Sequence, residues 1–324
     1  MKILHITAHM GGGIGTVISS WLSQRPGHTV ACLDYLNDKY KAESYVRDYG
    51  IFGNMLKEPS FLVSLIEQYD IVVVHYWDSP FLRKLFSYSL PESRMVFWCH
   101  KVFMPEPDAL AYPDKIIGTS PIQSFPEYIW STGDMQRFLS LKPVPHDGFN
   151  VGYIGTVDYK KMHPEFIDMC LAADIPDAHF YVIGENKIGG KIGKKFTFTG
   201  KVDDVAPYLA RLDVLGYPLR RNHYGTCEQV IGEAMCAGVV PVCLNNDAES
   251  TIIDHEENGF LAVDEADYIR KIEYLARHRV RLKAMSERSR IDGAKIYSID
   301  RMVWLWDEIF GQMMLKEKTF KRPL

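Results

Sequence analysis

Short apolar runs rich in β-branched residues alternate with helix-length segments along most of the 324-residue chain. In the first part of the chain, these runs predict strands at residues 2–7, 28–34, 70–76, 94–100 and 115–120. In the second part they predict strands at residues 150–155, 179–184, 196–200, 213–218, 239–244 and 259–263. Several runs are apolar at nearly every position, which is typical of strands buried on both faces of a parallel sheet.

The pattern breaks at residues 140–149, where "SLKPVPHDGF" contains two prolines and a glycine and is typical of a linker. The series of strands and helices on either side predict two doubly wound α/β domains, whose ligands bind beyond the carboxyl ends of the strands. We place the first domain at residues 1–145 and the second at residues 146–298. The remaining segment, 299–324, holds a predicted helix and a basic tail that could pack back on the first domain.

Composition and charge exclude several classes of protein. The net charge of −4 does not favour a nucleic-acid binder, because such proteins usually carry a basic surplus. None of the six cysteines forms a CxxC pair, so neither a zinc site nor a disulfide framework is indicated. No signal peptide and no run of roughly 20 apolar residues is present, which predicts a cytoplasmic protein. The basic tail at 315–324 fits either a solvated terminus or contact with the anionic inner face of a membrane.

A glycine-rich loop follows the first predicted strand, in "HITAHMGGGIGTVISSWL" at residues 5–22. Glycines such as Gly12 and Gly13 let the backbone approach a ligand closely, and N–H groups at the start of the next helix would attract a phosphate. The spacing does not fit the dinucleotide fingerprint GxGxxG, because the third glycine would fall at Thr16. A plain tight turn remains the alternative.

A second loop leads into a short helix in "YGTCEQVIGEAMCAGVVPV" at residues 224–242. Thr226 and Gln229 stand at the spacing of a capping box, which predicts that the helix begins at Cys227. Gly238 is expected to end the helix. The sequence therefore predicts a short helix between a polar turn and a buried strand.

The start of this helix is a predicted anion site in the second domain. Its first amides, near Cys227, Glu228 and Gln229, would be open to a ligand, and Gly225 removes side-chain bulk on the approach. Glu228 could instead be a first-turn acid that complements the helix dipole. Glu233 lies deeper in the helix, where a carboxylate can accept hydrogen bonds from the two hydroxyls of a ribose. Its alternative is a solvated helix residue.

The segment "GTCEQVIGEAMCAGVVPV" at 225–242, followed by "ESTIIDHEENGFLA" at 249–262, resembles the donor-binding region of retaining GT-B glycosyltransferases of the group-1 family. The resemblance extends to "VGYIGTVDYKKMHPEFI" at 151–167 and covers almost the whole chain. It implies an α/β GT-B fold with two doubly wound Rossmann-like domains facing a central cleft. It also implies transfer of a sugar from a UDP- or GDP-linked donor to a hydroxyl of a glycan or lipid-linked acceptor, in the synthesis of cell-surface glycans or polysaccharides.

The resemblance assigns the donor-binding residues one by one. Glu233 matches the glutamate that binds the donor ribose. Another family glutamate, eight positions earlier, is replaced by Gly225, so Glu228 or backbone amides would take over its contact with the donor sugar. Lys161 matches the lysine that neutralises the diphosphate.

The family's diphosphate arginine is absent, because Thr156 occupies its position. The resemblance therefore leaves a missing positive charge, and Lys160, Arg220 and Arg221 are the candidates to supply it; "PLRRNHYGT" favours one of the two arginines. His100 ends a predicted strand and matches a histidine that faces the cleft near the donor sugar. Its alternative is a histidine bonded by backbone at a strand end. No DxD metal signature stands out, so no metal cofactor is predicted.

Two rival functions remain open at this point. Gly225 and Thr156 remove two charges that the family uses, which fits a non-catalytic sugar-nucleotide-binding subunit that supports a partner transferase. An epimerase on a similar scaffold would convert the donor without any acceptor. The loop that carries Lys161, which we call the lysine loop, and the segment "EAM" at 233–235 favour the transferase over the epimerase.

Overall fold

The computed structural model describes residues 1–25, 27–34, 36, 50–102, 104–189 and 193–323. The chain divides into two compact units. The first unit consists of Met1–Asp134, Gly225–Cys227 and Ile299–Leu324. The second unit consists of Met135–Tyr224 and Glu228–Ser298. No helix among the described residues has the length and apolar character needed to cross a bilayer.

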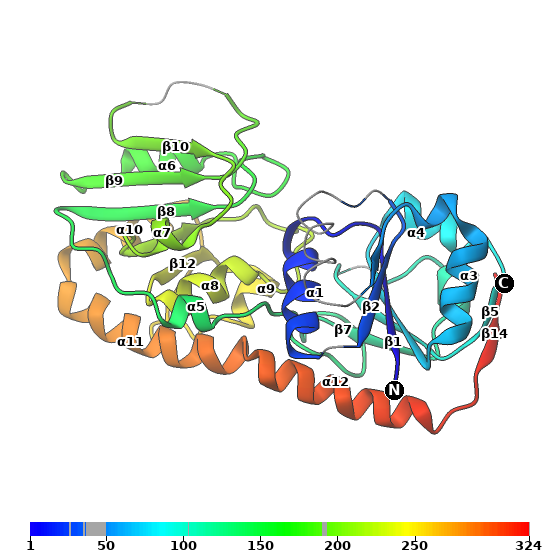
Figure 1. Cartoon of the computed structure of the whole chain (residues 1–324). Coiled ribbons are helices and arrows are strands. Elements are labelled where there is room, and N and C mark those ends of the chain that lie inside the picture. The colour runs from blue at the N-terminus through cyan, green and yellow to red at the C-terminus, as the bar shows by residue number, and fades with distance from the viewer. Residues whose placement is uncertain (26, 35, 37–49, 103, 190–192, 324) are drawn as a thin grey trace. The chain divides into compact units, whose positions relative to one another are not determined.

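The first unit is built on a six-stranded sheet with the strand order β3-β2-β1-β4-β6-β7 (Figure 1). All of its strand pairs are parallel. Its strands are β1 (Ile3–Thr7), β2 (His28–Cys32), β3 (Ile51–Phe52), β4 (Ile71–Tyr76), β6 (Met95–Cys99) and β7 (Lys115–Gly118). Five of these strands coincide with the apolar runs of the sequence to within two residues.

Helices cover both faces of this sheet. They are α1 (Gly12–Gln24), α3 (Pro59–Gln68), α4 (Pro80–Leu85) and α12 (Ile299–Met314), with 3-10 turns at Met55–Lys57 and Ala109–Ala111. On one face, Trp21 of α1 and Trp306 of α12 pack with Trp98 of β6. On the other face, Leu65 of α3 and Leu82 of α4 pack with the sheet. The helix predicted at 299–315 is thus α12, and it completes the core of the first unit.

The basic tail is folded against the first unit. Its strand β14 (Thr319–Lys321) pairs antiparallel with β5 (Leu90–Ser93), a strand that the apolar pattern did not reveal. Lys321 is only 3% exposed, and its Nζ lies 2.6 Å from Oδ1 of Asp114. The Nζ of Lys318 donates to the main-chain carbonyl of Tyr69 at 2.8 Å. The expectation of a solvated terminus was therefore wrong, because these lysines bind protein groups.

The second unit repeats the architecture with a six-stranded sheet in the order β10-β9-β8-β11-β12-β13. All of its strand pairs are parallel. The strands are β8 (Phe149–Ile154), β9 (Ala178–Ile183), β10 (Phe196–Gly200), β11 (Val214–Tyr217), β12 (Val240–Leu244) and β13 (Phe260–Ala262). The prediction of two doubly wound α/β sheets is confirmed.

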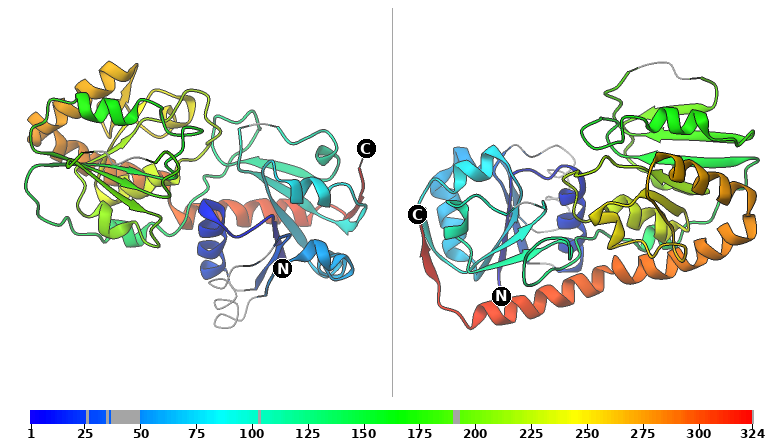
Figure 2. Two further views of the ribbon diagram at one scale, coloured as in Figure 1. Left: turned by 90° about the horizontal axis from the view of Figure 1, so that it is seen from above. Right: turned by 180° about the vertical axis from the view of Figure 1, so that it is seen from behind.

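The helices of the second unit place α8 against the sheet. They are α5 (Gln136–Leu139), α6 (Phe166–Ala172), α7 (Ala206–Leu209), α8 (Gln229–Ala237), α9 (Asp247–Ser250), α10 (Glu265–Arg277) and α11 (Arg279–Ile296). Figure 2 shows the ribbon of the chain from two further directions. Glycines let α8 and α11 approach closely. A Cβ on Gly232 would lie 2.5 Å from the Tyr297 ring, and one on Gly293 would lie 2.7 Å from Met235. This packing fixes the start of α8, where the candidate site lies.

Candidate functional site

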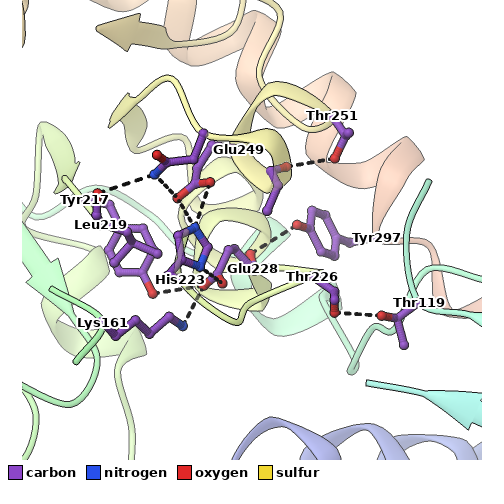
Figure 3. A network of polar contacts seen from close by, with 12 residues as sticks. Thr119, Lys161, Tyr217, Leu219, His223, Thr226, Glu228, Glu249, Thr251 and Tyr297 are labelled. Atoms are coloured by element: carbon purple, nitrogen blue, oxygen red, sulfur yellow. Dashed lines mark hydrogen bonds and ion pairs between the residues drawn. The ribbon is translucent and has the colours of Figure 1, made fainter. Parts of the chain in front are cut away.

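The loop after β8 carries Lys161 to the residue that precedes α8. The Nζ of Lys161 lies 2.8 Å from Oε2 of Glu228, and the side chains are 23% and 5% exposed (Figure 3). The hydroxyl of Tyr217, the last residue of β11, donates to the same carboxylate oxygen at 3.0 Å. Three separate segments of the second unit therefore meet at one buried carboxylate.

Both members of this pair are held in their charged forms. Burial alone would raise the pKa of Glu228, but the charges of Lys161 and His223 and the hydrogen bonds from Lys161 and Tyr217 outweigh it and lower this pKa. Burial alone would lower the pKa of Lys161, but the carboxylate of Glu228 raises it instead. The site thus maintains a permanent positive charge that is still partly open to solvent.

A second buried carboxylate extends the cluster. The Nε2 of His223 lies 3.1 Å from both carboxylate oxygens of Glu249, which is 0% exposed. The Nδ1 of His223 lies 3.8 Å from Oε1 of Glu228, so the histidine stands between the two acids. We call Lys161, Tyr217, His223, Glu228 and Glu249 the Glu228 cluster. Sequence reasoning missed Tyr217, His223 and Glu249, although Glu249 opens the segment that resembles the family.

The structure separates the two arginine candidates. The backbone N–H of Arg220 donates to the carbonyl of Lys161 at 2.9 Å, and its guanidinium donates to the carbonyl of Tyr159 at 3.3 Å. Arg220 therefore lies against the loop that carries Lys161, and its side chain is exposed to solvent. The guanidinium of Arg221 instead donates to the carbonyl of Val263 at 2.9 Å. Thr156 is exposed at the end of β8, and its side chain brings no charge.

The predicted start of the short helix was wrong. Helix α8 begins at Gln229 with Glu228 as its N-cap residue, and no side-chain cap is made. The hydroxyl of Thr226 lies 2.7 Å from that of Thr119, so it is not available to cap the helix. Cys227 precedes the helix, and its Sγ donates to a main-chain carbonyl, that of Ser131.

The end of the helix agrees with the prediction. Gly238 has φ of 80° and forms the left-handed C-cap. Gly225, Thr226 and Cys227 group with the first unit, whereas Glu228 and Gln229 belong to the second. The predicted anion site near Cys227 therefore shifts two residues along the chain, to the first turn of α8.

Glu233 lies in α8 apart from the Glu228 cluster. Among the described residues, the structure records no hydrogen bond or ion pair for its carboxylate, which is partly exposed. Burial raises the pKa of Glu233 most strongly, the positive charge of Arg137 lowers it, and the negative charge of Asp204 raises it further. Together these effects raise the pKa to about 7. Glu233 is thus a carboxylate with free hydrogen-bonding capacity at a different place from Glu228.

The remaining predicted residues lie in the first unit. Helix α1 begins at Gly12, which is exposed, has φ of 62° and has open space where a Cβ would stand. Gly13 follows it in the first turn and is also exposed. His100 comes directly after β6, and its Nε2 lies 3.1 Å from Nδ1 of His75. The ring of His100 is therefore bonded by the side chain of His75, and its backbone N–H donates to the carbonyl of Tyr76.

A family model matches part of this chain, and solved structures share its fold. Residues 148–278 match the family model described as glycosyl transferases group 1. No curated protein matches the chain in a sequence search. The fold is similar to that of Anabaena HepE in complex with UDP and glucose, with a TM-score of 0.77 and 14% identity over 96% of this chain and 100% of that chain.

Two further solved structures have the same fold over nearly their whole length. A glycosyltransferase from Rickettsia africae has a TM-score of 0.75 and 14% identity, over 97% of this chain and 98% of that one. Sucrose-phosphate synthase from Thermosynechococcus elongatus has a TM-score of 0.72 and 14% identity, over 97% and 100%. The matched family domain contains Lys161, Glu228 and Glu233. Residues 148–278 therefore match the group 1 glycosyl transferase family, and the chain has the GT-B fold.

Proposed function

We propose that this protein is a glycosyltransferase that moves a sugar from a nucleoside diphosphate to a hydroxyl of a glycan or lipid-linked acceptor, with retention of configuration, in the synthesis of a cell-surface polysaccharide. The observation that carries the proposal is the charged, partly solvent-open Lys161 held at the start of α8 by Glu228. UDP-sugars are the first donors to test, because HepE was solved with UDP-glucose. GDP-sugars come next.

The chemistry follows from the charge that develops in the reaction. When the sugar leaves its diphosphate, negative charge grows on the departing phosphate oxygens. Lys161 and the peptide N–H groups at the start of α8 meet that charge where it grows, which is stabilisation specific to the transition state. Glu228 keeps Lys161 charged and in position. Arg220 supplies the second positive charge, because Thr156 stands where the family has an arginine.

Glu233 binds the donor ribose in this proposal, and Glu233→Gln should raise the KM for the donor. A hydrogen bond to a charged group contributes about 1.5–3 kcal/mol, so the expected rise is roughly 10- to 100-fold. Since the pKa of Glu233 is raised to about 7, the binding-competent carboxylate forms as pH rises through that value, and the wild-type KM should fall there. Steady-state kinetics between pH 6 and 8 measure both effects.

The exposed Glu287, on α11, provides a matched control. Glu287→Gln should leave the KM for the donor within about 2-fold of wild type, as is usual for surface substitutions. A Glu233→Gln enzyme with the wild-type KM and the wild-type pH profile would remove Glu233 from the donor site.

The proposed reaction uses no metal ion, because Lys161, Arg220 and peptide dipoles neutralise the diphosphate. Transfer measured in excess EDTA should therefore proceed within about 2-fold of the rate in Mg²⁺ or Mn²⁺, since fixed charges and dipoles can act without a divalent ion. Loss of activity in EDTA that Mn²⁺ alone restores would overturn this part of the proposal.

The site of action proposed here is the cytoplasm, at the inner face of the membrane when the acceptor is lipid-linked. Membrane contact does not rest on Lys318 and Lys321, because both side chains bind protein groups.

The function itself is tested by release of nucleoside diphosphate from a panel of UDP-, GDP- and ADP-sugars, with and without an acceptor extract. We expect one donor to be consumed, and only when acceptor is present. Equal consumption without acceptor, with an epimerised sugar as the product, would contradict transfer. Tight donor binding without turnover under every condition would contradict it as well.

A further inference from the structure

Four histidines form one hydrogen-bonded row across the sheet of the first unit. They lie on neighbouring strands, with His28 on β2, His5 on β1, His75 on β4 and His100 directly after β6. The Nδ1 of His28 lies 2.9 Å from Nε2 of His5, and Nδ1 of His5 lies 3.1 Å from Nε2 of His75. The Nδ1 of His75 lies 3.1 Å from Nε2 of His100. The same two nitrogens meet at each step, always in the same order.

The row follows from the register of the parallel strands. Each step moves to the next strand and two residues further along it, which keeps all four side chains on one face of the sheet. The backbone pairs that define these steps are His28 with Ile3, His5 with Val73, and His75 with Trp98. The face concerned is the one that α1 and α12 cover.

The inner rings are enclosed by aromatic side chains. His5 and His75 are 0% exposed and His28 is 6% exposed. Trp21 of α1 lies 4.7 Å from His5 between ring centres, and Phe310 of α12 lies 6.1 Å from His28. Burial lowers the pKa of His28 to about 4 and that of His100 to about 3, and it lowers those of His5 and His75 strongly. All four rings are therefore neutral at neutral pH.

Because all four rings are neutral, the nitrogen that carries the proton in one ring determines which nitrogen carries it in the others. A neutral imidazole has one N–H and one bare nitrogen, so a ring that is bonded at both nitrogens must donate at one and accept at the other. His5 and His75 are bonded in this way, and one choice therefore fixes every bond. Either all four rings carry the proton on Nδ1, or all four carry it on Nε2.

Charges near His28 decide between these two arrangements. Arg25 and Asp307 form an ion pair at 2.5 Å, and both act on His28, the carboxylate more strongly than the guanidinium. A negative charge beyond the His28 end favours an N–H on the nitrogen that points out of the row, which is Nε2. The aromatic rings of Trp21, Trp98 and Phe310, which pack against the row, carry no charge.

We infer that the row fixes His100 with its proton on Nε2 and with a bare Nδ1 that accepts a hydrogen bond from a hydroxyl, and that His28, His5 and His75 are the positioning residues that set this state. The structure records no hydrogen bond for Nδ1 of His100 among the described residues, so this atom has the capacity to accept one. That the hydroxyl belongs to a sugar rests on the proposed function.

The test reads the proton positions directly, by long-range ¹H–¹⁵N correlation spectra of the ¹⁵N-histidine-labelled full chain at pH 7 without donor or acceptor. The four rings should be neutral and protonated on Nε2. Asp307→Asn should raise the fraction of His100 protonated on Nδ1 on the order of 2- to 5-fold, the effect of one exposed charge. Arg25→Met should shift the same fraction in the opposite direction. Both substituted side chains are on the surface, 39% and 44% exposed, so the variants should fold.

Matched variants separate coupling along the row from a general change in charge. Glu127→Gln also removes a carboxylate from an exposed ion pair of the first unit, with Lys115, and should leave His100 unchanged. His75→Phe interrupts the row, and in that background Asp307→Asn should no longer affect His100. Mixed tautomers, a charged ring at pH 7, or an unchanged His100 in Asp307→Asn would each overturn the inference. Since no substrate is present, a failed transfer assay beside intact coupling would count against the proposed function alone.

Discussion

Replacing Lys161 with methionine should slow sugar transfer by about 10²- to 10³-fold, the usual cost of removing one group that stabilises developing negative charge. Lys161 is held charged by Glu228 at 2.8 Å and remains 23% exposed, so it can reach a ligand from solvent. Its charge acts on the leaving diphosphate, so kcat should fall more than the affinity for the donor. Steady-state and single-turnover kinetics with the identified donor measure this split.

The stability of the same variant needs a separate measurement, because Lys161→Met leaves the buried Glu228 without its partner. Breaking a buried pair in this way costs about 3–5 kcal/mol of folding free energy. Adding Glu228→Gln removes the unpaired charge and should restore much of that stability. The double variant should nevertheless remain as slow as Lys161→Met.

Lys160 provides the matched control for the lysine loop. It is adjacent in sequence and exposed, so Lys160→Met should change the rate by no more than about 2-fold, as is usual for a surface substitution. A double variant of Lys161→Met and Glu228→Gln that is stable and transfers sugar at the wild-type rate would show that the pair is only structural.

Mild acid should strongly destabilise the first unit because of its buried histidines. In the unfolded chain a histidine has a pKa of about 6.5, whereas burial keeps the pKa values of His5, His28, His75 and His100 well below that in the folded unit. Below pH 6.5 the unfolded state therefore binds protons that the folded state does not. The free energy of unfolding should fall as pH falls, by about 1.4 kcal/mol per pH unit for each ring and about 5.5 kcal/mol per pH unit for the four.

This loss is comparable to the whole stability of a typical domain, which is about 5–15 kcal/mol. All six tryptophans lie in the first unit, so their fluorescence during urea unfolding reports on that unit alone. The window from pH 6.5 to 5 isolates histidines, because most carboxylates protonate at lower pH. His28→Gln should reduce the slope by about 1.4 kcal/mol per pH unit. A wild-type free energy of unfolding that stays constant across this window would contradict neutral buried rings.

Apolar patterning was sufficient to predict the two sheets but not every strand. Strands such as β4 and β8 are buried along their whole length, so their apolar runs stand out from the helices around them. Strand β5 has the sequence Leu-Pro-Glu-Ser and pairs only with the tail, and nothing in such a short polar segment indicates a strand. Its partner β14 is shorter still, and its sequence is typical of a solvated basic terminus.

The candidate site was predictable where its residues match a family motif and not where it depends on distant partners. Lys161 and Glu233 were predicted in this way, whereas Glu228 was predicted from its place at the expected start of the helix; Lys161 and Glu228 meet in the structure. The capping box failed because the Thr226 hydroxyl contacts Thr119, which is 107 residues away in sequence. Four of the strands predicted in the first domain each contain a histidine, but the row that these histidines form depends on strand order and register, which one sequence does not reveal.

The most direct test of the account is a crystal structure of the chain with its UDP-sugar donor or the nonreactive product UDP. We expect a β-phosphate oxygen within hydrogen-bonding distance, about 2.7–3.2 Å, of Nζ of Lys161, with peptide N–H groups at the start of α8 on the same diphosphate. A bound diphosphate elsewhere, with Lys161 still turned to Glu228 and making no phosphate contact, would contradict it.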